Sequence, residues 1–97
     1  MKIYVSHPFG GNHENILKVE QIIKELVKSN PEHTYISPIH AFGYLYDAVD
    51  YETGLSWCLE LLDMCDKMYV FGEWKQSRGC TAEVLYAEMH MIPYEIR

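Results

Sequence analysis

One stretch of the chain combines a hydroxyl, a cation, a glycine and a carboxylate, and it reads Ser77-Arg78-Gly79-Cys80-Thr81-Ala82-Glu83. It lies between an apolar run at 68–71 and an amphipathic segment at 84–91, a pattern that predicts a strand, a polar loop and a helix. Glycine lets backbone approach a bound group closely, and the free N–H groups at a helix start favour an anion. Ser77, Arg78 and Gly79 are therefore predicted to form an anion-binding lip.

Glu83 closes this stretch, in the first turn of the predicted helix. A carboxylate would repel a phosphate unless it faces another part of the ligand, such as a sugar carbon that gains positive charge. The alternative is that Glu83 only complements the helix dipole, as acidic residues in first turns often do. The local pattern leaves both interpretations open.

A second polar loop, Ser6-His7-Pro8-Phe9-Gly10-Gly11-Asn12, follows the short β-branched and aromatic run at 3–5. If that run is a central parallel strand, Ser6, His7, Pro8, Phe9, Gly10 and Gly11 lie at its carboxyl end, where open α/β sheets bind ligands. The Gly-Gly pair is equally typical of an ordinary turn.

The elements that must position these loops follow from hydrophobic periodicity. Apolar residues at helical spacing predict a helix that starts at Asn12 or Asn15 and stops before Pro31, and a second helix capped by Thr53 that closes between Asp63 and Asp66. Strands are predicted at 34–37, 68–71 and 92–96, and the last helix is expected to turn Val84, Leu85 and Met89 inward. The segment 39–51 fits either a distorted helix or a lid. With right-handed crossovers, these elements form one domain over residues 1–97, a three-layer α/β sandwich with a mainly parallel four-stranded sheet.

The net charge, the apolar runs and the cysteines limit which partners and which compartment the sequence predicts. The chain has 97 residues, a formal net charge of −6 and a sequence pI near 5.2, which argues against a general nucleic-acid or anionic-membrane surface. No apolar run approaches the roughly 18 residues of a membrane span. Cys58 and Cys65 share an apolar helical stripe and are predicted to be packing residues. The odd set of three cysteines and the short apolar start predict a cytoplasmic protein.

Several familiar kinds of site are not favoured. The five histidines lack metal-ligand spacing, and there is no G-x-S-x-G elbow or Walker loop. What remains is Glu83, the lip, the loop after the first strand, Asp66 and the tyrosine-rich segment at 39–51, all expected at strand carboxyl ends. The side chains of Tyr44, Tyr46 and Tyr51 fit either stacking on a base or covering the edge of the core. A carboxylate beside a phosphate site suits cleavage of a glycosidic bond, in which a second acid protonates the leaving base. Asp66, Asp47 and Asp50 are the candidates for that acid.

Five segments together resemble the nucleoside 2-deoxyribosyltransferase-like superfamily, in particular its short phage and bacterial branch. They are residues 4–8, 62–66, 68–72, 74–83 and 87–93. The resemblance implies a Rossmann-like or flavodoxin-like fold, a nucleophilic or sugar-stabilising Glu83, and an acid at Asp66. Ser77 stands where transferases place an Asp, and is similar to the phosphate-binding Ser of nucleoside 5′-monophosphate N-glycosidases. The resemblance also implies homo-oligomers, dimers or larger, in which a neighbour can complete the pocket.

These observations predict a protein that binds a small nucleoside or nucleotide and cleaves or transfers its N-glycosidic bond, with Glu83 at C1. Neither a metal nor an organic cofactor is expected. The alternative is a noncatalytic sensor or sequestering protein for a nucleotide-derived ligand. A purely structural subunit is the third possibility.

Overall fold

A computed structural model describes residues 1–97. Its centre is a sheet of four parallel strands, β1 (Lys2–Ser6), β2 (Thr34–Ile36), β3 (Lys67–Val70) and β4 (Tyr94–Ile96), in the order β2-β1-β3-β4. The strand order reverses between β1 and β3, and such a switch point is where open α/β sheets hold their ligands. The predicted four-stranded parallel sheet is confirmed.

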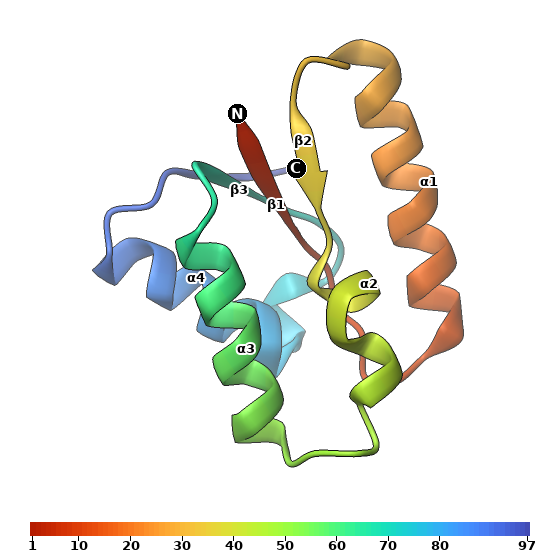
Figure 1. Cartoon of the computed structure of the whole chain (residues 1–97), viewed down its shortest axis with the longest axis vertical. Coiled ribbons are helices and arrows are strands. Elements are labelled where there is room, and N and C mark those ends of the chain that lie inside the picture. Colours follow the sequence, from red (N-terminus) through yellow and green to blue (C-terminus); the bar gives the residue numbers. More distant parts are fainter.

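Helices cover both faces of the sheet (Figure 1). Side chains alternate along a strand, so neighbours in β1 face opposite layers. One face packs on α1 (His13–Ser29) through Ile3, Val5, Val19, Leu26, Ile39 and Tyr69. The other packs on α3 (Tyr51–Asp63) and α4 (Arg78–Met89) through Tyr4, Leu62, Cys65, Met68, Val70, Val84 and Ala87. The three-layer sandwich is therefore confirmed.

Polar N-cap residues determine where α1 and α3 begin, and the sequence predicted these starts only approximately. Asn12 is the cap of α1, and its side chain accepts a hydrogen bond from the Glu14 amide at 2.9 Å. The predicted cap of the next helix, Thr53, is wrong. Asp50 is the cap instead, because its carboxylate accepts from the Thr53 amide at 2.9 Å and so places Thr53 inside the first turn.

The segment between β2 and α3 contains a short helix, α2 (Pro38–Phe42), and a 3₁₀ turn, η1 (Gly43–Leu45). Ser37 caps α2, with its hydroxyl accepting from the His40 amide. The distorted-helix alternative is therefore the one observed. None of the helices combines the length and the apolar character needed to cross a membrane.

Helix α4 begins at Arg78, directly after its cap Ser77, rather than near position 84 as predicted. Glu83 consequently lies in the second turn, on the buried face of the helix. The expected inward packing of Leu85 and Met89 is wrong, since these side chains are 57% and 71% exposed. The buried face has the helical spacing of Cys80, Glu83, Val84 and Ala87.

Candidate active site

A cavity of about 760 Å³ opens at the carboxyl ends of β1 and β3. Its walls come from the loop after β1, from the segment spanning α2 and the start of α3, and from the loop and first turns that lead into α4. We call it the central cavity. Its volume lies within the range of about 300–1,000 Å³ that is typical of small-molecule sites.

Glu83 lines the central cavity, although its residue is only 5% exposed. Its Oε1 accepts a hydrogen bond from the Ser6 hydroxyl at 2.7 Å, and its Oε2 accepts one from the Tyr4 hydroxyl. Tyr4 and Ser6 stand two residues apart on β1 and therefore face the same side of the sheet. Strand β1 thus supplies two donors that hold both oxygens of one carboxyl group.

The pKa of Glu83 reflects a competition between burial and these hydrogen bonds. Burial raises it from 4.5 to about 7, while the hydrogen bonds from Tyr4 and Ser6 act in the opposite direction. The predicted place of Glu83 in the first turn of the helix is wrong, and the alternative that it complements the helix dipole loses its support, because the dipole effect has fallen off by the second turn. A carboxyl group with a pKa near 7 exchanges its proton readily at neutral pH.

Ser77, Arg78 and Gly79 all line the central cavity. The Ser77 oxygen accepts from the Cys80 amide at 3.2 Å, which leaves its hydroxyl hydrogen free to donate. Arg78 is the only Lys or Arg among the lining residues, and its side chain is largely exposed. A Cβ built on Gly79 would meet no atom within 4 Å, so a ligand can approach the backbone there.

The loop after β1 divides into residues that line the central cavity and residues that support it. His7, Pro8, Phe9 and Gly10 line it, whereas Ser6 and Gly11 do not. Ser6 is fully buried behind Glu83 and holds that carboxyl group. Gly11 has φ +74°, and a Cβ there would lie 2.8 Å from the Tyr46 ring, so the turn needs glycine at this position.

Asp66 is the predicted site residue that the structure does not bring to the central cavity. It precedes β3, and its Oδ2 accepts from the Lys2 amide at 2.7 Å, at the amino end of β1. Ser6 and Glu83 lie at the other end of β1, roughly 13 Å away at the usual rise of a strand. The expectation that Asp66 lies at a strand carboxyl end is wrong, because it comes before its strand and not after it.

The other two acids differ in position. Asp47 does not line the central cavity, whereas Asp50 does. Hydrogen bonds from the Thr53 side chain and amide lower the pKa of Asp50, so its carboxyl group is ionised at neutral pH. Asp50 therefore has no proton to give to a leaving base.

The sequence did not single out several residues of the site. Tyr4 does not line the cavity but holds Glu83 from behind, Cys58 lines it from α3, and Glu73 lines it from the loop after β3. Tyr51, which belongs to the predicted tyrosine-rich segment, also lines it from α3. The alternation Tyr4-x-Ser6 places two hydroxyls on one face of a strand, and this is the signal that could have found Tyr4. Burial raises the pKa of the Cys58 thiol to about 11, so it stays protonated.

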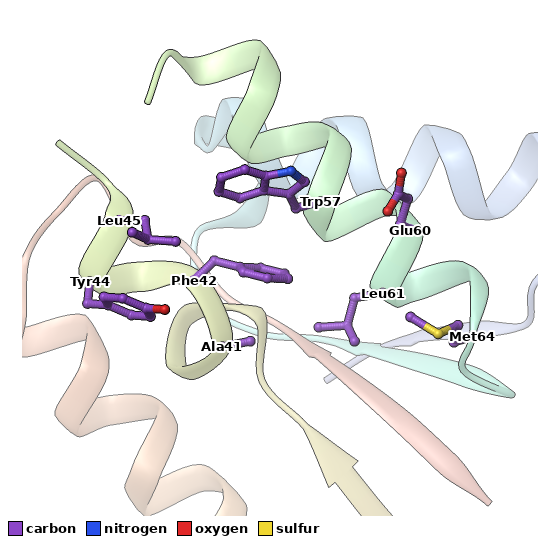
Figure 2. Close-up of a pocket in the computed structure, with 8 residues that line it drawn as sticks. All are labelled: Ala41, Phe42, Tyr44, Leu45, Trp57, Glu60, Leu61 and Met64. Carbon is purple, nitrogen blue, oxygen red and sulfur yellow. The ribbon is translucent and has the colours of Figure 1, made fainter. Parts of the chain in front are cut away.

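A second hollow, the outer groove, lies on the far side of Phe42 and measures about 330 Å³. Figure 2 shows it between the α2–η1 segment and α3, with the Phe42 and Trp57 rings facing each other. Its other lining residues are Ala41, Tyr44, Leu45, Glu60, Leu61 and Met64. Phe42 lines both hollows. Nowhere do three His, Cys, Asp or Glu side chains gather closely enough to hold a metal ion.

The fold and this cavity define a Rossmann-like α/β protein with a buried carboxyl group at the carboxyl edge of its sheet. The chain belongs to the family described as a domain of unknown function, DUF4406, whose model matches residues 1–94. Its structure is similar to that of a 2-desoxiribosyltransferase from Leishmania mexicana, with a TM-score of 0.68 and 15% sequence identity. The similarity covers 98% of this chain and 62% of the Leishmania chain. A comparison with curated proteins gave no match.

Proposed function

We propose that this protein binds a nucleoside or nucleotide in the central cavity and cleaves or transfers its N-glycosidic bond, with Glu83 acting at C1 of the sugar. The observation that carries the proposal is the Glu83 carboxyl group, buried at the wall of a ligand-sized cavity and held by Tyr4 and Ser6. The fold shared with a 2-desoxiribosyltransferase supports a nucleoside as the ligand.

In this proposal the C1–N bond breaks, its electron pair leaves with the base, and C1 becomes oxocarbenium-like. The ionised Glu83 carboxylate stabilises or attacks C1. Water or a second base then attacks C1, any bond from C1 to Glu83 breaks, and the proton that the attacking group loses goes to the departed base. Tyr4 and Ser6 orient the carboxylate toward one position, which is how prearranged hydrogen bonds contribute to catalysis. Since the pKa of Glu83 is about 7, the ionised form that this step requires dominates above neutral pH.

The lip supports a nucleotide rather than an uncharged nucleoside. Arg78 contributes the cavity's only fixed positive charge, and Ser77 retains a hydroxyl hydrogen to donate. Cations and hydroxyl donors of this kind suit a phosphate group. We place the phosphate of the ligand at this lip and its sugar beside Glu83.

The test is base release from a panel of ribo- and deoxyribonucleosides and their 5′-monophosphates, followed by chromatography. Glu83→Gln keeps the shape of the side chain but removes its charge, so base release should fall by about a thousandfold or more. Glu88→Gln is the matched control, because Glu88 is an exposed residue of the same helix. Wild-type protein that releases no base from any compound would overturn the catalytic proposal.

A noncatalytic ligand-binding protein is the second candidate, and a specific observation favours it. None of the three acids predicted to protonate a leaving base can do so beside Glu83, since Asp66 is remote, Asp47 does not line the cavity and the pKa of Asp50 is lowered. Glu73 is the remaining carboxyl group in the lining. Calorimetry with the same panel separates the two candidates. Tight binding without base release supports a sensor or sequestering role.

We further propose that copies of the chain associate through the outer groove, and that the protein works in the cytoplasm. The groove exposes large apolar side chains, including Tyr44 at 82% and Met64 at 63%, and exposed apolar patches often mark protein contacts. The three free cysteines suit a reducing compartment. Sedimentation should show an assembly that Met64→Glu dissociates, whereas a wild-type monomer at all concentrations would contradict association.

A further inference from the structure

Tyr51 is the first residue of α3, and it shares one face of that helix with other residues of the central cavity. Gly54, Leu55 and Cys58 follow it at spacings of three, four and seven, which places all four residues on the same side. All four line the cavity. The start of α3 therefore presents the Tyr51 side chain to the ligand space.

The Tyr51 hydroxyl oxygen is buried and has no hydrogen-bond partner, and it is the only buried side-chain nitrogen or oxygen of which this is true. Leaving such a group unpaired costs about 1–3 kcal/mol, so native proteins normally provide a partner. Burial raises the pKa of Tyr51, and Glu83 adds to this against the opposing charge of Arg78. The hydroxyl therefore keeps its proton at neutral pH and can donate it in a hydrogen bond.

The Tyr51 ring is held by the lip. The Arg78 guanidinium carbon lies 3.9 Å from the ring centroid, within the range of a cation–π contact. The Nη2 atom of the same guanidinium lies 3.6 Å from the Glu52 carboxylate. Because the Arg78 side chain is largely exposed while the Tyr51 hydroxyl is buried, the ring spans from the cavity mouth to its interior.

We propose that the Tyr51 hydroxyl hydrogen-bonds a sugar hydroxyl of the bound ligand and so helps to determine which sugar the protein accepts. This inference rests on the proposed function, because Glu83 acting at C1 places the sugar, rather than the base or phosphate, in the interior of the cavity. The ligand then supplies the partner that the buried hydroxyl lacks. Arg78 binds the phosphate of the same ligand at the mouth of the cavity, and its guanidinium holds the Tyr51 ring in place.

The test compares wild type with Tyr51→Phe, which removes only the hydroxyl. The probes are 5′-monophosphates of one base, the most tightly bound of the panel, carrying ribose, 2′-deoxyribose or 2′,3′-dideoxyribose. Affinity by calorimetry, and kcat/KM where base is released, should fall about tenfold for a sugar with the partner hydroxyl. The loss should be less than about twofold for the dideoxy form, which has no hydroxyl on these carbons.

Tyr44→Phe is the matched control, because Tyr44 is exposed in the outer groove and does not line the central cavity. Without ligand, Tyr51→Phe should melt no lower than wild type, since it removes an unpaired buried hydroxyl. An equal loss for all three sugars, or no loss for any of them, overturns the assignment of Tyr51 and leaves the proposed function standing. A sugar-dependent loss of affinity without base release supports the assignment and overturns only catalysis. Failure of wild type to bind any of the three overturns both.

Discussion

The two hollows of this protein share Phe42 as a wall but differ in what else surrounds them. The central cavity contains a buried carboxyl group held by two hydroxyls, a cation at its mouth and an unpaired phenol. The outer groove has seven hydrophobic lining residues out of eight. Convergent polar groups in a mostly apolar pocket are typical of a small-molecule site, whereas an open apolar groove is typical of a protein contact. This difference is the basis on which we propose chemistry for the central cavity and association for the outer groove.

The largest expected difference concerns stability against pH. The pKa of Glu83 is raised from 4.5 to about 7 in the folded state, so its stabilising contribution is complete below the unfolded value and is lost as pH rises through about 7. From about pH 5 to about pH 8 this should lower the free energy of unfolding by about 2–3 kcal/mol. Denaturant titrations at both pH values should show that Glu83→Gln lacks this loss. Glu60→Gln, in the outer groove, should retain it.

Removing the Tyr4 hydroxyl should leave the Glu83 carboxyl group with the Ser6 hydroxyl as its remaining hydrogen-bond donor. The hydrogen bond from Tyr4 lowers the pKa of Glu83, so in Tyr4→Phe this pKa should rise further. The pH midpoint of base release should then move upward by about one unit, with about a fivefold loss of rate at pH 7. A pH–rate profile measures both, with Tyr44→Phe in the groove as control. An unmoved midpoint would show that Tyr4 does not tune the reacting group.

Arg78→Met should separate charged from uncharged ligands. The guanidinium is exposed, so its attraction to a phosphate is partly screened, and affinity for 5′-monophosphates should fall about fivefold. The corresponding nucleosides serve as the internal control and should lose less affinity, because they share any effect of the substitution on the Tyr51 ring but have no phosphate. Calorimetry at low salt measures both series. Equal losses in the two series would place the phosphate away from Arg78.

The smallest expected effect tests whether the two hollows are independent. Met64→Glu should dissociate the assembly, yet ligand affinity should change by less than about twofold, because Met64 does not line the central cavity. Calorimetry on protein diluted to its monomeric state makes the same comparison without a substitution. A large loss of affinity in either experiment would mean that a neighbouring copy completes the pocket, and the distinction between the two hollows would fail.

Strong periodic patterns predicted the layers of the fold from the sequence. The apolar stripe of α1 can be buried only against a sheet face, and the apolar run of β1 only inside a sheet. The alternation of strands and helices along the chain then predicts a parallel sheet between two helix layers. Local capping was harder to predict. Asp50 and Thr53 are both good caps, and only the hydrogen bond from the Thr53 amide to the Asp50 carboxylate decides between them. The first turn of α4 contains Gly79, a residue typical of loops, and was therefore predicted as a loop.

The candidate site was predictable where it follows strand ends and unpredictable where it depends on packing. The loop after β1 directly follows its strand, and the lip lies on the connection from β3 to α4, so their approach to one another follows from a parallel sheet. The raised pKa of Glu83 depends on the burial of its side chain, which cannot be predicted from the residues around it in the sequence. Asp66 was grouped with the strand carboxyl ends although it precedes the predicted strand at 68–71, so the strand was predicted and the edge of the sheet was wrong. The tyrosine-rich segment was a candidate from the sequence, but Tyr51 could be singled out from it only once its hydroxyl was seen to lack a hydrogen-bond partner.

Phe42 has a practical consequence for the study of this protein in solution. Its ring lies 5.7 Å, centroid to centroid, from that of Trp57, one of the two tryptophans in the chain. A ligand in the central cavity that contacts Phe42 and shifts its ring should change the environment of the Trp57 indole, because the two rings are in contact. Intrinsic tryptophan emission, with Trp74→Phe to remove the second fluorophore, therefore offers a label-free signal of occupancy.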